Sequence, residues 1–314
     1  MNLLFVTDPL ATFKITKDST YAMMREAASR GHRLAACGPQ DLRWQRGAAV
    51  EALACEIELT GEPEAWFRAA APQPLALRDA GAVLMRKDPP FDSEYFYATH
   101  LLGQAEREGA RVFNKPAALR DHPEKLAIME FAPYIAPTLV TRSAAEVRRF
   151  HAEQRDIILK PLDGMGGMGI FRVGPDGLNL GSIVETLNRD GAQTLMVQKY
   201  LPEIAQGDKR VLVIGGEPVP YALARIPQGS EIRGNLAAGG KGVAQPLTAR
   251  DREIAGALGP VLAARGLLLV GIDVIGDCMT EINVTSPTCF QEITQQTGFP
   301  VAKMYLDALE RALA

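Results

Sequence analysis

The glycine-rich stretch LKPLDGMGGMGIFRV restricts the fold more than any other part of the chain. Gly164, Gly166 and Gly169 match the pattern G-x-G-x-x-G, with Gly167 added. A dinucleotide-binding turn leads into a helix, but residues 170–173 are β-prone and end at the turn signal GPDG. No Lys-Ser or Lys-Thr follows the glycines, which excludes a Walker loop. The pattern predicts a strand–loop–strand unit, which is either a flexible turn or a loop whose bare amides approach phosphate oxygens.

The first 115 residues alternate between strand and helix patterns. We expect helices at residues 19–30 and 92–108, ended by Gly31 and Gly109, and strands at residues 3–6, 33–37, 82–86 and 111–113. This order is typical of βαβ units and predicts a parallel sheet covered by helices. Residues 40–80 show no clear periodicity.

The pattern changes after two short helices, which are expected at residues 124–131 and 144–154. A mixed, largely antiparallel α+β unit is predicted to follow, with strands from residue 156 and at 170–173, 194–198, 210–214, 219–225, 267–275 and 279–284, and helices at 183–188, 248–265 and 300–312. Thr248 is the expected N-cap of the second of these helices. Residues 226–242 contain five glycines and no hydrophobic period, which predicts a long mobile loop.

Composition narrows the function classes. A formal net charge of -3 gives no general attraction to nucleic acid or to an anionic membrane. The first residues lack a signal peptide's basic region, and no apolar run is long enough to span a bilayer, so we expect a cytoplasmic protein. The four cysteines and four histidines show no metal-ligand spacing, so a disulfide framework or a zinc site is not expected. Carboxylates, amides and lysines are left for the chemistry, which favours magnesium.

Hard oxygen ligands gather in the stretch GIDVIGDCMTEINVTSPT, residues 271–288. Glu281 and Asn283 lie two apart on a strand and so share a face. Asp273 joins that face if a three-residue loop, Gly276 to Cys278, pairs it with Glu281, whereas a two-residue turn would pair it with Thr280. We expect the three-residue loop, because an unpaired carboxylate within an apolar strand would be costly. The stretch therefore predicts a magnesium site, with a solvated surface hairpin as the alternative.

Basic side chains flank these elements in a slightly acidic chain. Any one of them is more often a solvated surface charge than a ligand contact, but their concentration at strand ends and in the glycine-rich loop favours a polyanionic ligand. They are Lys125, Lys160, Lys209, Arg210, Arg225, Arg233 and Lys241.

Six stretches together resemble the ATP-grasp superfamily and, more narrowly, the prokaryotic glutathione synthetases. They are MRKDPPFD, NKPAALRD, ILKPLDGMGG, DKRVLVIGGEPVPYALARIPQG, RGNLAAGG and TEINVTSPT, and they span nearly the whole chain. The resemblance implies an α/β and α+β chain with the ATP-grasp fold and an N-terminal Rossmann-like domain. It divides the chain into an N-terminal substrate domain at 1–122, a central subdomain at 123–200, and a C-terminal subdomain at 201–314 that carries the metal site and a lid at 226–242.

The same resemblance implies a role for each candidate residue. ATP would be held by two lysines, the glycine-rich loop, a hinge that reads adenine and an aspartate near the ribose: Lys125, Lys160, Gly164, Gly166, Gly167, Gly169, Gln198, Lys199, Tyr200, Leu201 and Asp208. Asp273, Glu281 and Asn283 match the ligands of magnesium, with manganese as the alternative ion. Arg210, Arg225 and Arg233 fall where the family places catalytic cations. Candidate substrate contacts are Asp18, Ser19, Arg86, Asn235, Lys241, Ser286, Pro287 and Thr288. Lys241 stands where an arginine is expected, and it cannot form a bidentate fork.

The activity that the resemblance implies is ATP-dependent ligation of γ-glutamylcysteine to glycine, with release of ADP and phosphate. The expected partners are these small molecules, with no nucleic acid and no membrane, and the family implies a homo-oligomer, specifically a tetramer. Two alternatives remain at this point. One is another carboxylate-amine ligase of the same fold, and the other is a nucleotide-binding regulator without catalysis.

Overall fold

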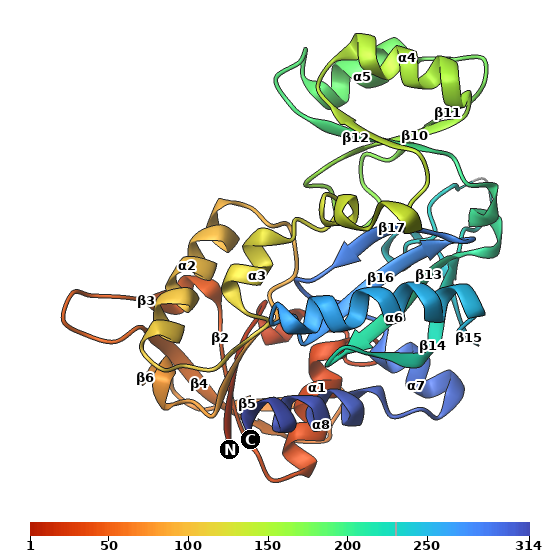
Figure 1. Cartoon of the computed structure of the whole chain (residues 1–314). Helices are drawn as coiled ribbons and strands as arrows, with labels where there is room; N and C mark the ends of the chain where they lie inside the picture. Colours follow the sequence, from red (N-terminus) through yellow and green to blue (C-terminus); the bar gives the residue numbers. More distant parts are fainter. Residues whose placement is uncertain (230) are drawn as a thin grey trace.

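The protein is described by a computed structural model that covers residues 1–229 and 231–314, and its strands form three sheets (Figure 1). The first sheet has the order β3-β4-β2-β1-β7-β8, and β5 and β6 also pair with β4. β1 is parallel to β2 and β7, and β7 is parallel to β8, which confirms the predicted parallel sheet. The strands are β1 (Asn2–Val6), β2 (Arg33–Cys37), β3 (Leu42–Arg43), β4 (Glu51–Leu59), β5 (Phe67–Ala69), β6 (Gln73–Ala76), β7 (Ala82–Met85) and β8 (Val112–Phe113).

Helices cover this sheet where the sequence predicts them. Asp18 and Asp92 cap the first turns of α1 and α2 by accepting hydrogen bonds from Tyr21 N at 2.7 Å and Tyr95 N at 2.9 Å. The helices of this part are α1 (Ser19–Ser29), α2 (Ser93–Arg107), α3 (Pro116–Asp121) and the short 3₁₀ helices η1 (Leu10–Thr12), η2 (Pro39–Asp41) and η3 (Leu77–Asp79).

Residues 40–80 form an antiparallel extension of the first sheet, which the sequence pattern did not resolve. β4 pairs antiparallel with β2, β3, β5 and β6. Its inward positions include the small Ala52 and Ala54, while Leu53 is 42% exposed. Small side chains inside and a large apolar one outside mask the period-two signal of a strand.

The second sheet forms a lobe that stands apart from the rest of the molecule in Figure 1. Its order is β11-β10-β12-β9, and all its neighbours are antiparallel. It consists of β9 (Thr138–Thr141), β10 (Ile157–Pro161), β11 (Phe171–Val173) and β12 (Leu195–Lys199), with α4 (Ala144–Gln154) and α5 (Leu180–Asn188). These helices share a core with the sheet that includes Val147, Leu159 and Val184. The predicted strand–loop–strand unit is confirmed, because the glycine-rich loop connects β10 to β11.

The helix expected at residues 124–131 is wrong in type and position. A 3₁₀ helix, η4 (Ala127–Tyr134), lies there instead, with non-helical dihedrals at Phe131 and a proline at Pro133. A proline lacks the N–H that a regular helix needs, so this segment cannot continue as an α-helix. The structure also adds α3 and β9, which the sequence analysis did not predict.

The third sheet is antiparallel, with the order β15-β14-β13-β16-β17. Gly215 and Gly216 join β13 to β14 with φ of 60° and 89°, a left-handed conformation that favours glycine. The strands are β13 (Asp208–Ile214), β14 (Glu217–Ile226), β15 (Lys241–Pro246), β16 (Leu269–Ile275) and β17 (Cys278–Asn283). The helices are α6 (Ala249–Ala264), with Thr248 as its N-cap as predicted, α7 (Phe290–Thr297), α8 (Val301–Leu313), and the 3₁₀ helices η5 (Pro202–Gln206) and η6 (Leu236–Ala238).

The turn between β16 and β17 is shorter than predicted, but the predicted pairing of Asp273 with Glu281 is present. The turn has two residues, since Ile275 pairs with Cys278, so the three-residue loop was wrong. A bulge then shifts the register, so that Thr280 is skipped and Asp273 lies opposite Glu281. The expected pairing is therefore confirmed, but a β-bulge produces it instead of a longer loop.

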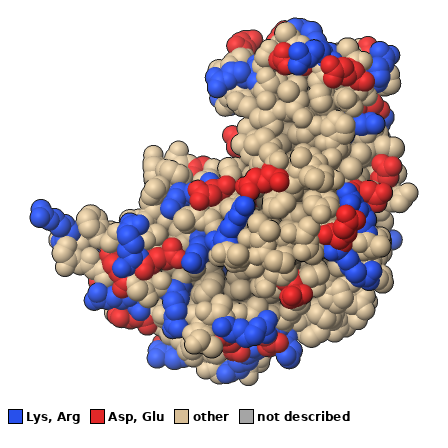
Figure 2. Space-filling model, viewed as in Figure 1, with Lys and Arg blue, Asp and Glu red and all other residues tan. Residues whose placement is uncertain are grey.

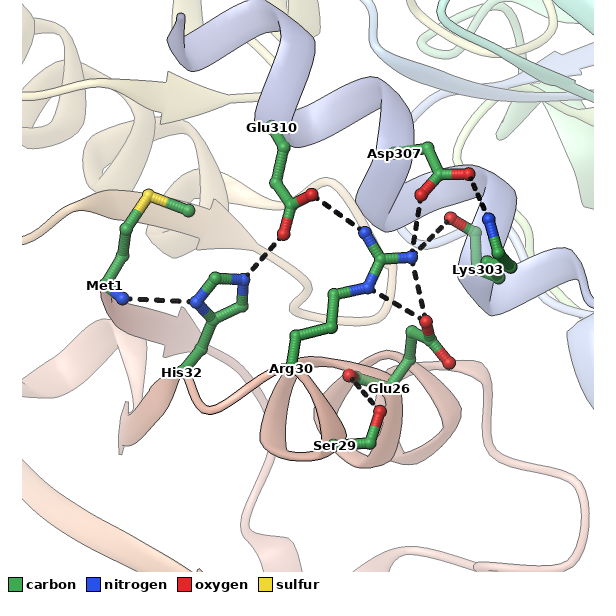
Figure 3. A network of polar contacts seen from close by, with 8 residues as sticks. All are labelled: Met1, Glu26, Ser29, Arg30, His32, Lys303, Asp307 and Glu310. Atoms are coloured by element: carbon green, nitrogen blue, oxygen red, sulfur yellow. Dashed lines mark hydrogen bonds and ion pairs between the residues drawn. The ribbon is translucent and has the colours of Figure 1, made fainter.

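The C-terminal helix packs against the N-terminal unit, as Figure 3 shows. Arg30 at the end of α1 contacts Glu310 at 2.9 Å and Asp307 at 2.8 Å, both on α8. His32 joins the same network through Glu310 Oε1 at 2.8 Å, and its other ring nitrogen lies 3.1 Å from the Met1 amine. One hydrophobic core includes residues of β1, of α8 and of β13, so the first and third sheets share a core.

The region predicted as a mobile loop is partly ordered into elements. It contains η6, and its last two residues belong to β15. Ser230, within the same prediction, lies outside the described residues. The division at residues 122 and 200 stays a prediction, although the three sheets follow one another along the chain. Over the described part of the chain, no helix combines the length and apolar character needed to span a bilayer.

Candidate active site

A cavity of about 310 Å³ is lined by residues from both the lobe of the second sheet and the third sheet. Asp88 and Pro89, which follow β7 of the first sheet, also contribute to its wall. The predicted site residues that line it are Lys125, Lys160, Gly164, Gly166, Gly167, Gln198, Lys199, Tyr200, Leu201, Asp208, Arg210, Arg225, Arg233, Asn235, Glu281, Asn283, Ser286 and Thr288. The fold thus brings most candidates from distant parts of the sequence to one place.

The cavity wall carries both cations and carboxylates, and its buried cations include two lysines. On the face shown in Figure 2, basic and acidic side chains are interspersed and form no continuous field of one sign. Lys125 and Lys160, in contrast, are each only 6% exposed and both line the cavity. A buried cation is costly unless it is paired, so the contacts of these two lysines matter.

The two lysines connect the lobe to the third sheet. Lys125 Nζ lies 2.6 Å from the carbonyl oxygen of Gly164 and 3.0 Å from Glu281 Oε1. Lys160, near the end of β10, donates to the carbonyl oxygen of Thr280, the bulged residue, at 3.2 Å. Burial lowers the pKa of Lys160; the Glu281 carboxylate opposes this shift and the nearby Lys125 adds to it.

The glycine-rich loop forms one wall of the cavity. Gly166, Gly167 and Gly169 have φ of 60°, 84° and 71°, which side chains rarely adopt. Gly164, Gly166 and Gly167 line the cavity, whereas a side chain at Gly169 would meet Pro161 at 3.1 Å. The loop therefore presents bare backbone to the interior, as a phosphate-binding loop requires.

The predicted lid contacts this glycine-rich loop. Arg233 Nη1 donates to the carbonyl oxygen of Gly167 at 3.2 Å, and the same side chain forms an ion pair with Glu231. A Cβ atom at Gly167 would lie 2.7 Å from Asn235 Oδ1, so the two loops touch. Residues 232–236 of this segment line the cavity, and its role as a lid stays a prediction.

Two arginines and two carboxylates form a buried cluster at the centre of the third sheet. Arg210 on β13 holds Asp273 through both carboxylate oxygens, at 2.5 and 3.0 Å. Arg225 on β14 bridges Asp273 at 2.8 Å and Asp208 at 2.5 Å. Burial alone would raise the pKa of Asp273, but the guanidinium groups of Arg210 and Arg225 overcome it and hold this pKa well below its usual range.

Asp208 differs from Asp273 in having an unused oxygen. Its Oδ2 pairs with Arg225, while its Oδ1 is buried and has no hydrogen-bond partner among the residues that the structure describes. Burial raises the pKa of Asp208 to about 6; Arg225 opposes the shift and the Asp273 charge adds to it. A buried acceptor at a cavity wall fits a hydroxyl donor from a ligand, because leaving it unpaired is costly.

Glu281 and Asn283 both face the cavity from β17, as their spacing predicts. Asp273 lies opposite Glu281 but is held by the two arginines. Over residues 1–229 and 231–314, no three His, Cys, Asp or Glu side chains are grouped as a metal site. A carboxylate, an amide oxygen and ligand phosphates together suit Mg²⁺, which is often bound in this way.

The predicted hinge, residues 198–201, consists of the last two residues of β12 and the two that follow them. Gln198 is buried and donates to Thr138 Oγ1 at 3.1 Å, and Tyr200 N donates to the carbonyl oxygen of Asp156 at 2.9 Å. The guanidinium of Arg172 lies 3.7 Å from the centre of the Tyr200 ring, which fixes the ring from outside. Apolar side chains complete this part of the cavity wall: Ile158, Ile170, Ile204, Leu236 and Ile275.

Some predicted substrate contacts do not line the cavity. Arg86 is buried and donates to Thr20 Oγ1 at 3.1 Å and to the carbonyl oxygen of Pro287 at 3.0 Å. Ser19 Oγ accepts from Phe290 N at 3.1 Å, and Asp18 caps α1. These contacts connect the N-terminal unit to the segment after β17, next to Ser286 and Thr288. Lys241 is exposed at the start of β15.

Sequence reasoning missed Glu124, which lines the cavity beside Lys125. The sequence analysis placed it at the start of an expected helix and assigned it no role, and only its neighbour Lys125 could have pointed to it. The apolar wall residues were missed as well. They lie on β10 and β16, on the 3₁₀ helices η5 and η6 and just before β11, and no shared local pattern distinguishes them from core.

Comparison with known proteins gives the family. The family model for the prokaryotic glutathione synthetase N-terminal domain matches residues 1–120, and that for the ATP-grasp domain matches residues 124–298. A glutathione synthetase of Ralstonia nicotianae is 63% identical over 312 residues, covering 99% of this chain and 96% of the relative. One of Neisseria meningitidis serogroup B is 57% identical, covering 98% of each.

Solved structures support the same fold at much lower identity. D-cycloserine synthetase DcsG superimposes with a TM-score of 0.72 at 17% identity, covering all of both chains. The ATP-grasp ligase PsnB, complexed with a minimal precursor, gives 0.63 at 19% identity, covering 99% of each chain. The chain therefore belongs to the prokaryotic glutathione synthetase family and is an ATP-dependent ligase with the ATP-grasp fold.

Proposed function

We propose that this enzyme ligates γ-L-glutamyl-L-cysteine to glycine, with ATP as the energy source and an acyl phosphate as the intermediate. The observation that carries the proposal is the meeting of Lys125, Lys160, the glycine-rich loop, Glu281 and Asn283 on one cavity. Together these groups offer cations and bare amides for phosphates, and oxygen ligands for a divalent cation. The curated relatives named glutathione synthetase support the choice of substrates.

In the proposed binding mode, the adenine lies against the apolar wall and the hinge at residues 198–201. The unpaired Oδ1 of Asp208 would accept a hydrogen bond from a ribose hydroxyl. Lys125, Lys160 and the glycine-rich loop would hold the phosphates. Glu281 and Asn283 would hold Mg²⁺, or Mn²⁺ in its place, with Asp273 behind them. A bound divalent cation would neutralise charge on the phosphoryl oxygens.

The chemistry needs two steps, because a carboxylate is a poor electrophile. First, a carboxylate oxygen of the cysteinyl residue attacks the γ-phosphorus of ATP, and the bond to the β-phosphate oxygen breaks to release ADP. Second, the glycine amine attacks the acyl carbon, the carbon–oxygen bond breaks, and phosphate leaves as the nitrogen loses a proton. Lysines, arginines and the glycine-rich loop orient the phosphates and balance their charge, which is the main contribution a protein makes to phosphoryl transfer.

Arg210, Arg225 and Arg233 are proposed to stabilise the transferring phosphoryl group and the substrate carboxylate. The first two are held rigidly by Asp208 and Asp273, so they are already oriented. Arg233 belongs to the lid, and its closure would exclude water from the acyl phosphate. Asp18, Ser19, Arg86, Asn235, Lys241 and Ser286 to Thr288 are proposed to position the peptide and glycine.

The test is phosphate release and product formation with ATP and Mg²⁺, with γ-glutamylcysteine and glycine omitted in turn. We expect strong turnover only when both are present, and one ADP per glutathione. Turnover with other amino acids but not with γ-glutamylcysteine would indicate a different carboxylate-amine ligase. ATP binding without any turnover would indicate a regulator.

Three further proposals rest on family membership. We propose that the enzyme uses Mg²⁺ in preference to Mn²⁺, that it forms a homo-oligomer, specifically a tetramer, and that it acts in the cytoplasm. Titration of activity with each metal and light scattering of the purified protein test the first two. Localisation of a tagged protein in its native cell tests the third.

A further inference from the structure

Glu124 is a half-buried glutamate at the cavity wall, and the hydrogen bonds that it accepts all come from one segment of chain. Its Oε1 accepts from Val284 N at 2.9 Å, from Thr285 N at 3.1 Å and from Thr285 Oγ1 at 2.8 Å. Its backbone carbonyl oxygen accepts from Ile282 N at 3.0 Å. One residue thus holds four donors of residues 282–285.

The segment that Glu124 holds lies between two groups of candidate site residues. On the N-terminal side, Glu281 and Asn283 line the cavity from the end of β17. On the C-terminal side, Ser286 and Thr288 line it directly after the segment. β17 ends at Asn283, so the next residues lack the regular pairing of a sheet. Glu124 replaces that pairing on one side, and Asn114 Nδ2 holds the Val284 carbonyl oxygen at 2.8 Å on the other.

The neighbouring residue extends the connection across the cavity. Lys125 contacts Gly164 of the glycine-rich loop and Glu281 of β17. Glu124 and Lys125 are consecutive, so one short stretch of backbone carries the contacts to the glycine-rich loop, to the end of β17 and to the segment at 284–288. The glycine-rich loop and Glu281 are held by the side chain of Lys125, whereas residues 284 and 285 are held by the side chain of Glu124, so substitution of Glu124 alone acts on the second contact.

A carboxylate at this place is costly for stability alone. Partial burial raises the pKa of Glu124, and the nearby charge of Glu281 adds to this shift. An uncharged acceptor would satisfy the same donors without that repulsion. What a carboxylate adds is a stronger hold on its three donors, because hydrogen bonds to a charged acceptor are about twice as strong as neutral ones.

We propose that Glu124 is a positioning residue for the ligation reaction. It fixes residues 284–288 so that Ser286 and Thr288 present the amino-acid substrates to the phosphoryl group, while ATP is held by other residues. This inference rests on the proposed function for the identity of those substrates. It predicts that loss of Glu124 affects the peptide and glycine more than the nucleotide.

The test compares Glu124→Ala, which removes the acceptors, with Glu124→Gln, whose amide oxygen can accept the same hydrogen bonds. The matched control is Glu130→Ala, which removes a glutamate of η4 that pairs with Arg265 at the surface, outside the cavity. For Glu124→Ala we expect kcat/KM for γ-glutamylcysteine and glycine to fall on the order of 10²-fold, because a displacement of about 1 Å has that effect. The Kd of ATP should stay within about threefold.

The conservative variants separate positioning from charge. Glu124→Gln, whose neutral oxygen accepts the same hydrogen bonds more weakly, should recover part of the lost kcat/KM. Thr285→Val, which removes only the hydroxyl donor, should reduce the same constants by a smaller factor than Glu124→Ala. Glu130→Ala should behave as the parent. The proposal is wrong if Glu124→Ala leaves both amino-acid constants within twofold of the parent, if ATP affinity falls in parallel with turnover, or if Glu124→Gln is as impaired as Glu124→Ala.

A readout independent of catalysis is hydrogen exchange at the amides of Val284 and Thr285. Both should exchange faster in Glu124→Ala than in the parent and in Glu130→Ala, and unchanged protection would contradict the proposal. If the parent forms no glutathione, the proposed function fails. The exchange data and the ATP affinities would still decide whether Glu124 positions this segment.

Discussion

Replacing Gly234 by alanine tests whether the predicted lid must pack tightly on the arginine cluster. A Cβ atom built at this position would lie 2.1 Å from the carbonyl oxygen of Arg225 and 3.3 Å from Cβ of Asp208. Contact at that distance is impossible, so the lid or the Arg225 backbone must move by more than about 1 Å. Such a shift would displace a guanidinium that pairs with both Asp208 and Asp273.

The expected loss follows from that displacement. A movement of about 1 Å at a positioned group reduces kcat/KM on the order of 10²-fold, equivalent to about 2.7 kcal/mol of transition-state stabilisation. Overpacking should also destabilise the fold by about 1–3 kcal/mol, which lowers Tm by about 2–4 °C for each kcal/mol. Steady-state kinetics of glutathione formation and thermal unfolding measure the two effects separately.

The matched control is Gly239→Ala in the same segment. A Cβ atom there would meet no atom of residues 1–229 and 231–314 within 4 Å, although φ is +91°. This variant therefore carries the backbone strain of a left-handed residue, about 1–2 kcal/mol, without a collision. We expect its kcat/KM to stay within about threefold of the parent. Equal kcat/KM values for Gly234→Ala and the parent would refute the reasoning.

Four other changes have expected outcomes. Glu281→Gln should keep the fold and lose most activity, because an amide cannot hold Mg²⁺ or Lys125 as a carboxylate does; near-parent rates in limiting magnesium would contradict this. Gly166→Val should weaken ATP binding, because φ of 60° disfavours a side chain and the loop faces the cavity; calorimetry that finds unchanged affinity would show that the loop does not hold ATP. A short Gly-Ser linker in place of residues 228–240 should leave ATP affinity within a few fold but raise the ratio of ADP to glutathione, and a one-to-one ratio at the parent rate would show that this segment is no lid. For Asp208, burial raises the folded pKa from 3.8 to about 6, so the folded state binds the proton more tightly and this group's contribution to stability is lost as pH rises through that window. The free energy of unfolding of the parent minus that of Asp208→Asn, measured with denaturant, should therefore decrease as the pH rises from about 4 to about 6. A difference that does not change with pH would contradict the raised pKa.

The sequence predicted the elements whose signals are local. The parallel strands of the first sheet, the strand–loop–strand unit at residues 157–173 and the helix capped by Thr248 all carry their own periodicity, turn or cap. β4 escaped prediction because its inward alanines and its outward Leu53 reverse the usual pattern. Its place in the sheet is decided by its pairing with β2, which no local pattern encodes.

The candidate site shows the same limit. The facing of Glu281 and Asn283 follows from strand periodicity, and the structure places both on the cavity wall. The pairing of Asp273 with Glu281 depends on the bulge at Thr280, which sequence alone could not distinguish from a longer turn. Glu124 belongs to the site only because the fold brings residues 284 and 285 to it from 160 positions away.

The acyl-phosphate intermediate is tested most directly by following oxygen from the peptide carboxylate into the released phosphate. γ-Glutamylcysteine labelled with ¹⁸O in its cysteinyl carboxylate is incubated with enzyme, ATP, Mg²⁺ and glycine, and the released phosphate is analysed by mass spectrometry. If ligation proceeds through the acyl phosphate, each phosphate formed with glutathione carries one oxygen from that carboxylate. Glutathione formed together with unlabelled phosphate would contradict the proposed intermediate, and with it the role assigned to the cavity.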